Sequence, residues 1–298
     1  MLTKKFDYTI ARFDRPKDAN LDEISQADLL YFNGYVPGGI YHSKRMIWVG
    51  NLASANDALA FIRSKRERKH LIKNKKKLLS QGYQINTKLF DQQSFKQFDQ
   101  LFKKTTLNRQ RALNDSPKRA ILSKVLVGAK IYLSGIYQAD QLVAGLAFIV
   151  RKKTALVSLG AKTKNNQLRG GYGGLLEIEL LDFCYQHQLT TIMHGRRCFN
   201  PVGLISKIGL FEFKARYGFN AYPTENWQTM FILKPKIFLS DVIFTTIHNN
   251  QVGYLIITDQ QPAKIKPKYT TKDINNIACT DFAALNKQRD QFLKRLNR

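Results

Sequence analysis

The sequence predicts an α/β protein in which a mixed sheet is flanked by helices. Short runs in which apolar and polar residues alternate predict strands, and longer runs with apolar residues three and four positions apart predict helices. Glycine and proline separate these runs. A chain of 298 residues with 44% hydrophobic composition is long enough to bury one large core or two small ones.

Changes in composition divide the chain into four stretches. They are a β-rich lead-in at 1–55, a basic helix at 56–81, a core at 82–235 and an appendage at 236–298. The lead-in is rich in proline, glycine and short β-type runs, whereas the appendage combines a hairpin pattern with a last helical pattern.

The elements expected before the core are short strands followed by one helix. The strands lie at Tyr8 to Phe13, Leu29 to Phe32 and Met46 to Val49. From Asn56 to Gln81 an apolar stripe with helical period predicts a single helix, and Gly82 is its expected stop.

This helix carries an unusual concentration of positive charge. Nine basic residues lie between its Arg63 and Lys77, and Glu67 is the only acid among them. The nine are Arg63, Lys65, Arg66, Arg68, Lys69, Lys73, Lys75, Lys76 and Lys77. Such a surface suits a phosphodiester backbone, because each phosphate that it neutralises releases counterions. The alternative is a solvated helix with no partner.

The core begins with a strand and two helices, and a three-strand meander follows them. The expected elements are a strand at Tyr83 to Phe90, a helix bearing Phe95, Phe98 and Phe102, a helix at Lys118 to Val127, and strands at Lys130 to Tyr137, Gln141 to Val150 and Thr154 to Ala161. The middle strand of the meander is almost entirely apolar and is expected to be buried on both faces.

A four-glycine turn follows the meander and opens an apolar helix, expected at Gly174 to Gln188. A strand at Leu189 to His194, a helix at Pro201 to Tyr217 and a last core strand at Trp227 to Leu233 come next. The appendage is expected to form a hairpin, Val242 to Ile247 with Val252 to Thr258, and a helix at Asp281 to Leu296.

The glycine turn is a candidate anion site. Gly170, Gly171, Gly173 and Gly174 lack a Cβ, so bare backbone can approach a ligand closely. The unpaired N–H groups of the helix that follows would point into the turn, as in phosphate-binding sites. A loop that simply precedes a core helix is the alternative interpretation.

The charge of the whole chain favours anionic partners. There are 48 Lys and Arg residues against 22 Asp and Glu residues, for a net charge of +26. Nucleic acid, an acidic membrane surface or a phosphorylated substrate would all suit it, and a bias in composition is the alternative cause.

The sequence carries no signal for export, for a membrane span or for a structural metal. No apolar run approaches the roughly 20 residues that a span requires, and the start, MLTKKFDYTIARF, lacks the apolar core of a signal peptide. Three cysteines, Cys184, Cys198 and Cys279, lie far apart and are expected to be free thiols. A cytoplasmic location is expected, with attachment to the inner membrane face as an alternative.

The order of elements from Tyr83 to Leu233 resembles the fold of the GNAT acyltransferases. The turn Arg169-Gly170-Gly171-Tyr172-Gly173-Gly174 is similar to the turn with which that family holds the pyrophosphate of acyl-coenzyme A. The resemblance implies a GNAT-like core that binds acyl-coenzyme A through these six residues, with Arg169 beside the phosphates.

A second match is to the FemABX-like group. Gly209-Leu210-Phe211-Glu212-Phe213-Lys214-Ala215-Arg216-Tyr217-Gly218 resembles a signature near the end of these transferases, and the basic helix resembles the one that precedes their second domain. In that group amino acids move from aminoacyl-tRNA to an amine. The resemblance implies that Lys214 stabilises charge in the substrate or transition state, and one interpretation of the lead-in is a reduced first domain.

Transfer of an acyl group to an amine needs a base and groups that hold the acceptor. His194 is the candidate base, because an imidazole titrates near neutral pH and the residue ends a strand; a hydrogen-bonded structural histidine is the alternative. Tyr217 could return a proton to the leaving group, and Arg196 and Arg197 could clamp an anionic acceptor. Cys198 has no neighbouring motif that would make it a nucleophile.

Two carboxylates interrupt the apolar helix, Glu177 and Glu179. The dipole of the first turns favours a carboxylate there, and Glu177 is the candidate for a place in the site. Exposure on a polar stripe is the other expectation for this pair.

These features predict an N-acyltransferase without a metal ion, which moves an acyl group from acyl-coenzyme A to an amine-bearing substrate. The alternatives are aminoacyl transfer from aminoacyl-tRNA, which the basic residues from Arg63 to Lys77 would favour, and a non-catalytic protein that binds nucleic acid or an acidic surface through its charge.

Overall fold

A computed structural model gives the structure of the chain. It describes residues 2–5, 8–43, 46–106, 129–163, 168, 171–194, 206–207, 213–223, 227–234, 242–248, 251–258 and 277–296. Within these ranges the chain is a mixture of helices and of strands in mixed sheets, so the α/β class predicted from the sequence is confirmed. Two compact units are present, the first made of 1–47, 196–214 and 220–298 and the second of 48–195 and 215–219.

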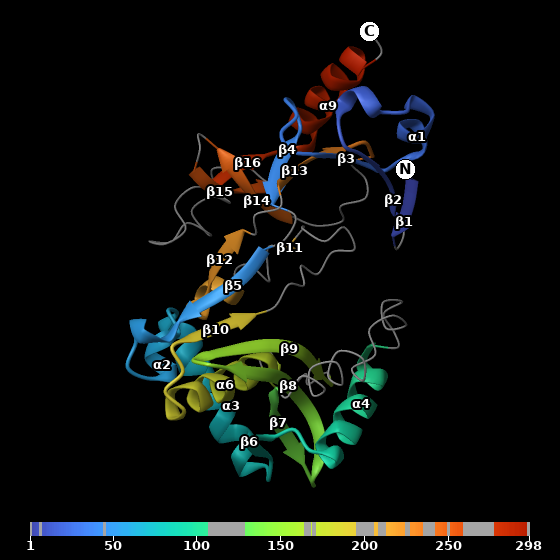
Figure 1. The fold of residues 1–298 in the computed structure, drawn as a ribbon. Coiled ribbons are helices and arrows are strands. Elements are labelled where there is room, and N and C mark those ends of the chain that lie inside the picture. Colours follow the sequence, from blue (N-terminus) through green and yellow to red (C-terminus); the bar gives the residue numbers. More distant parts are fainter. Residues whose placement is uncertain are drawn as a thin grey trace. The chain divides into compact units, whose positions relative to one another are not determined.

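The second unit contains the expected meander and the helices that cover it (Figure 1). Its elements are β5 (Met46–Asn51), which enters the unit at Trp48, a 3-10 helix (Leu52–Ser54), α2 (Ala58–Phe61), α3 (Lys65–Ser80), β6 (Gln84–Leu89), α4 (Gln92–Thr106), β7 (Lys130–Gln138), β8 (Gln141–Arg151), β9 (Thr154–Lys162), α6 (Gly173–Gln186) and β10 (Thr191–His194).

The sheet of this unit has the order β5-β10-β9-β8-β7-β6. Neighbouring strands from β9 to β6 are antiparallel, which confirms the meander, while β10 is parallel to β9 and antiparallel to β5. Because parallel neighbours need a crossover connection, α6 lies in the chain between β9 and β10. Strand β8 is buried along most of its length, as its apolar sequence predicted.

Helices cover both faces of this sheet, α4 on one face and α6 on the other (Figure 1). On the α4 face, Phe98 packs with Leu133 and Ala147, all three fully buried. On the α6 face, the ring of Phe183 lies 4.8 Å from that of Tyr132 and 5.2 Å from that of Phe148. The near-continuous apolar surface of α6 therefore has a physical cause, since it packs on the sheet and on α2 and α3.

The basic stretch is not one continuous helix, as the sequence had predicted for 56–81. Helix α2 ends at Phe61 and α3 begins at Lys65. Ser64 is the N-cap of α3, since its hydroxyl accepts a hydrogen bond from the Glu67 amide at 3.3 Å. The Ser64 amide donates a hydrogen bond to the carbonyl of Arg216, so a long-range contact stabilises the non-helical residues between α2 and α3.

The first unit combines the two ends of the chain. Its elements are β1 (Leu2–Lys5), β2 (Tyr8–Phe13), a 3-10 helix (Pro16–Asp18), α1 (Leu21–Gln26), β3 (Leu29–Asn33), β4 (Ile40–Ser43), β11 (Ser206–Lys207), β12 (Asn220–Pro223), β13 (Trp227–Ile232), β14 (Val242–His248), β15 (Gln251–Ile257), β16 (Ile277–Thr280) and α9 (Phe282–Leu296).

One sheet, in the order β1-β2-β3-β13-β4-β14-β15-β16, organises this unit, and β11 pairs with β14 off that path (Figure 1). The hairpin predicted in the appendage is confirmed as β14 and β15, and the last helix as α9. Phe292 of α9 stacks on Phe231 of β13 with ring centroids 4.0 Å apart, so the helix packs on the middle of the sheet.

This grouping of residues differs from the division that composition suggested. Strand β13, expected as the last strand of the 82–235 core, lies between β3 and β4 of the lead-in. The helix predicted from Pro201 to Tyr217 is wrong at Ser206–Lys207, which form the strand β11 and pair with β14. Residues 213–216 of that stretch are helical. The helix predicted at Lys118 to Val127 lies outside the described residues.

Candidate active site

The connection from β9 through α6 to β10 places the predicted site residues. Strand β10 ends at His194, which pairs with Val157 of β9 on one side and with Trp48 of β5 on the other. Helix α6 begins at Gly173, directly after the glycine turn. The strand end predicted for His194 is therefore confirmed, and α6 supplies the residues around it.

His194 and Glu177 form a buried pair. The Nε2 atom of His194 lies 2.9 Å from the Oε2 atom of Glu177, and the two side chains are 10% and 7% exposed. The ring of Phe219 meets the imidazole edge to face, with centroids 4.6 Å apart at 83°. The Nε2 atom of His194 is thus in close contact with a carboxylate, without the geometry of a hydrogen bond, and Phe219 packs against the imidazole ring.

Burial of this pair corrects one expectation from the sequence. Glu177 does not lie on an exposed polar stripe, and the side chain of Glu179 is only 15% exposed. Their directions differ, because Glu177 meets His194 on β10 whereas Glu179 lies near Thr87 on β6. A carboxylate inside an apolar helix needs a partner, and each of these has found one on a different strand.

Tyr217 is also buried, and its hydroxyl donates a hydrogen bond to the Oε1 atom of Glu67 at 3.1 Å. Burial raises the pKa of Tyr217 above its usual range, and the Glu67 and Glu177 carboxylates raise it further. The hydroxyl is therefore held as a donor to a carboxylate of α3, which is not the arrangement of a group that releases its proton easily.

The glycine turn is described from Gly171 onward. Gly171 has φ of +63°, a conformation that glycine adopts without strain, and a Cβ added there would meet nothing within 4 Å. A Cβ at Gly173 would lie 2.8 Å from the Nζ of Lys162, so this ammonium is next to the first residue of α6. Gly174 differs, because its missing Cβ makes room for the Tyr217 hydroxyl and for Leu71.

Tyr172 is the N-cap of α6 and makes no side-chain capping hydrogen bond to it. Its side chain is buried and lies beside Tyr83, with ring centroids 6.5 Å apart. The hydrogen bond with Tyr172 raises the pKa of Tyr83. Predicted as a binding residue for the pyrophosphate, Tyr172 thus offers its backbone, rather than its phenol, to the turn.

Of the remaining predicted residues, the structure describes Lys214 only. Lys214 belongs to the first unit, where it is buried with its Nζ 5.4 Å from the centre of the Phe213 ring. Arg169, Gly170, Arg196 and Arg197 lie outside the described residues, as does Cys198. The roles predicted for these residues stay predictions.

Three features of the site were not found from the sequence. Glu67 stood out only as the single acid in a basic run, and nothing in its spacing pointed to Tyr217. Lys162 lies one residue beyond the strand predicted at Thr154 to Ala161. Strand β9 also carries a β-bulge, because Ala147 pairs with Leu159 while Phe148 pairs with Val157, which leaves Ser158 as the extra residue.

Within the described part of the chain, no group of three or more His, Cys, Asp or Glu side chains is arranged to hold a metal ion. None of the helices in the described ranges is long and apolar enough to cross a membrane.

No protein-family model and no curated protein matches the sequence. Among solved structures, the chain is similar to the C-terminal domain of a putative lysylphosphatidylglycerol synthetase from Agrobacterium fabrum, with 12% identity and a TM-score of 0.44 over 77% of this chain and 79% of that one. A second similar structure is FemX, with 12% identity and a TM-score of 0.43 over 79% of this chain and 84% of that one.

A third similar structure is a tandem GNAT protein from the clavulanic acid biosynthesis pathway. It has 14% identity and a TM-score of 0.40, over 70% of this chain and 65% of that one. The names of FemX and of the tandem GNAT protein are those of the two groups that the sequence resembles.

Proposed function

We propose that the chain is an acyltransferase that moves an acyl group to an amine, with His194 as general base and Glu177 as the residue that positions it. The observation that carries this proposal is the buried contact of 2.9 Å between His194 Nε2 and Glu177 Oε2 at the end of β10. A carboxylate that holds one nitrogen of an imidazole fixes the tautomer and makes the other nitrogen available as a base.

The proposed chemistry builds on that contact. In the proposed reaction the Nε2 hydrogen of His194 turns toward Glu177, so that the lone pair of the neutral ring lies on Nδ1. This atom would accept a proton from the acceptor amine, directly or through one water, as the nitrogen attacks the acyl carbonyl carbon. A C–N bond forms, the bond from the carbonyl carbon to the leaving sulfur or oxygen breaks, and the leaving group takes up a proton.

The start of α6 supports an anionic acyl donor. Gly171 leaves open space, the N-cap of α6 makes no side-chain capping hydrogen bond, and the ammonium of Lys162 lies at Gly173. An ammonium near the positive N-terminal end of a helix is unfavourable by itself. It becomes favourable when a bound anion lies in contact with both the ammonium and the helix N-terminus. These residues fit a pyrophosphate, so acyl-coenzyme A is the first donor proposed; it supplies an activated thioester carbonyl.

Aminoacyl-tRNA is the second donor, favoured by the surface of α3. Most of the basic residues predicted to contact phosphates are exposed, and they include Arg66, Lys69, Lys73 and Lys76. They lie on one side of α3, while Leu71 and Leu78 on the other side are buried. A row of cations of this length matches a polyanion better than it matches one pyrophosphate.

The test measures donor binding and transfer separately. Calorimetry with acetyl-coenzyme A is carried out on the wild type, on Lys162→Ala and on Lys153→Ala, an exposed lysine in the β8–β9 turn that serves as matched control. We expect Lys162→Ala alone to weaken binding. Release of free thiol with a panel of amines then reports transfer, and His194→Gln is expected to lower its rate about 10²-fold or more without loss of donor affinity.

The same assays with aminoacyl-tRNA separate the two donors. Binding of tRNA that falls steeply with salt, together with transfer of the aminoacyl group, would select the second donor. If neither donor is bound, or if His194→Gln transfers at the rate of the wild type, the proposed function is wrong. Binding of RNA without transfer from either donor would indicate the non-catalytic alternative.

A further inference from the structure

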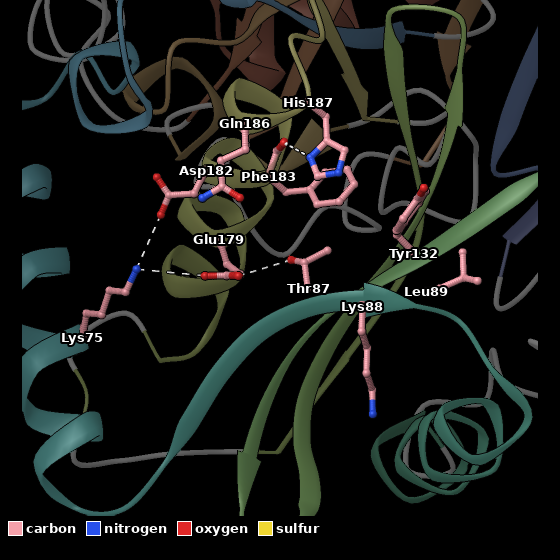
Figure 2. Close-up of a pocket in the computed structure, with 10 residues that line it drawn as sticks. All are labelled: Lys75, Thr87, Lys88, Leu89, Tyr132, Glu179, Asp182, Phe183, Gln186 and His187. Atoms are coloured by element: carbon pink, nitrogen blue, oxygen red, sulfur yellow. Dashed lines mark hydrogen bonds and ion pairs between the residues drawn. The ribbon is translucent and has the colours of Figure 1, made fainter.

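A hollow on the far side of α6 from His194 lies between α3, α6 and the edge of the sheet. Its volume is about 350 Å³, close to the lower limit for small-ligand sites. Figure 2 shows its lining: Lys75 from α3, Thr87, Lys88 and Leu89 from β6, Tyr132 from β7, and Glu179, Asp182, Phe183, Gln186 and His187 from α6 and its C-cap.

One wall of the hollow is acidic. The Nζ of Lys75 lies 3.5 Å from Asp182 Oδ2 and 4.0 Å from Glu179 Oε2, so one ammonium faces two carboxylates at loose distances. Thr87 donates to Glu179 Oε1 at 3.4 Å and is itself 2.7 Å from the Ser134 hydroxyl. Burial raises the pKa of Glu179, and the Lys75 ammonium partly offsets this effect. A further cation would stabilise the ionised carboxylate.

The rest of the lining is largely aromatic. The imidazole of His187 stacks on the Phe183 ring with centroids 3.9 Å apart and 20° between the planes. The ring of Tyr132 adjoins Phe183 at 4.8 Å, and Leu89, 57% exposed, extends the apolar surface along β6. The His187 Nδ1 atom is 3.0 Å from the Phe183 carbonyl oxygen, which holds the imidazole in this stack.

The local charge in the hollow is opposite to that of the whole chain. Its lining contains two carboxylates and two lysines, Lys75 and Lys88, whereas the chain carries a net charge of +26. Lys88 contributes little positive charge inside, because its side chain points away from the hollow in Figure 2. An anionic ligand would meet the Glu179 and Asp182 carboxylates, so charge favours a cation.

This hollow is separate from the His194 pair. Glu177 and Glu179 are two residues apart, so their side chains leave α6 in directions about 200° apart. One meets β10 and the other meets β6, at different positions in the sheet.

We propose that this hollow binds a small organic cation, a primary amine on an aromatic body. The ammonium would lie between Asp182 and Glu179, where Lys75 shows that the carboxylates accept such a group, and the body would rest against Tyr132 and His187. Aromatic faces attract both the ring of the ligand and its charge.

Lys75 is then a competitor for the same carboxylates. Its side chain is 36% exposed and its two contacts are long, so it can turn to solvent when another ammonium arrives. Removal of its charge would make the hollow more negative. The proposal therefore predicts opposite signs for two substitutions in one ion-pair cluster, which a purely structural role of that cluster would not produce.

The experiment is calorimetry of the full chain with three probes. Phenethylamine combines ring and ammonium, phenethyl alcohol keeps the ring without the charge, and propylamine keeps the charge without the ring. We expect saturable binding of phenethylamine, at least about tenfold weaker binding of the other two, and a decrease as salt rises. No saturable binding of phenethylamine, or equal binding of phenethyl alcohol, overturns the proposal.

Variants then place the binding in the hollow. Asp182→Asn, which keeps the shape of a half-exposed side chain, is expected to weaken phenethylamine binding about fivefold, and Lys75→Met is expected to strengthen it. Asp140→Asn, in the exposed β7–β8 turn, is the matched control and should have no effect. An equal loss in Asp140→Asn, or weaker binding in Lys75→Met, would show that the amine binds elsewhere.

Discussion

The hydroxyl of Tyr217 donates a hydrogen bond to the carboxylate of Glu67 at 3.1 Å, joining two residues that are 150 positions apart. Tyr217 is fully buried, and Glu67 stands at the start of α3. This bond ties the basic helix to the segment that follows β10, and it lies next to the first turn of α6, because the same hydroxyl occupies the space that a Cβ of Gly174 would take.

Loss of this hydroxyl is expected to destabilise the protein. Tyr217→Phe leaves the Glu67 carboxylate without its donor, and we expect the free energy of unfolding in urea to fall by about 1–3 kcal/mol. The control is Glu67→Gln in the Tyr217→Phe background, which removes the charge that has lost its partner and should recover part of the loss. Equal stability of Tyr217→Phe and the wild type would contradict the role assigned to this bond.

We expect the structure around Gly174 to tolerate not even an alanine at this position. A Cβ there would meet the Tyr217 hydroxyl and would lie 2.8 Å from Leu71 Cδ2, so we expect Gly174→Ala to cost about 1–3 kcal/mol through overpacking. In a double-mutant cycle with Tyr217→Phe, the cost of Gly174→Ala should shrink, because the closest atom is gone. Strict additivity of the two costs would show that the clash is relieved in another way.

The N-cap of α3 offers a third measurement. Ser64 accepts a hydrogen bond from the Glu67 amide, and Ser64→Ala is expected to lower the free energy of unfolding by about 1 kcal/mol. Ser64→Asp keeps an acceptor at the same place and should retain most of the stability. If both variants lose the same amount, the cap does not depend on the side-chain oxygen.

His42 predicts a dependence of stability on pH in the first unit. Burial lowers the pKa of His42 to about 4, while an unfolded histidine titrates near 6.5. Between these two pH values the unfolded chain binds more protons than the folded chain. The stabilising contribution of neutral His42 to the free energy of unfolding is therefore complete above pH 6.5 and is lost as pH falls towards 4.

The loss should reach about 3 kcal/mol at pH 4. The measurement is urea unfolding at several pH values, with His42→Gln as control because glutamine does not titrate. The difference between the two proteins should change over this window, and a difference that is constant with pH would contradict a neutral buried His42.

Much of the second unit could be predicted from local sequence. The alternation of apolar and polar residues predicted β7, β8 and β9 to within one residue at each end, and the apolar run predicted α6. These elements follow one another in the chain, so period and turn residues carry enough information about them. His194 could be placed at a strand end for the same reason.

The features that the sequence did not predict depend on contacts between residues far apart in the chain. Glu177 is buried in contact with His194, and the sequence spacing of the two residues does not predict this contact. At Ser206–Lys207 a helical pattern forms a strand, because β14 offers hydrogen bonds there. The place of β13 between β3 and β4 is likewise set by pairing across nearly the whole chain.

That position of β13 has a consequence for how the protein is made. Met230 of β13 pairs with both Tyr31 of β3 and Ile40 of β4. During synthesis β3 and β4 therefore lack this neighbour until β13 leaves the ribosome about 200 residues later. The segment 48–195 holds nearly all of the second unit and is synthesised during this interval. It can therefore fold first, while β3 and β4 keep open edges that a chaperone or another nascent chain could occupy.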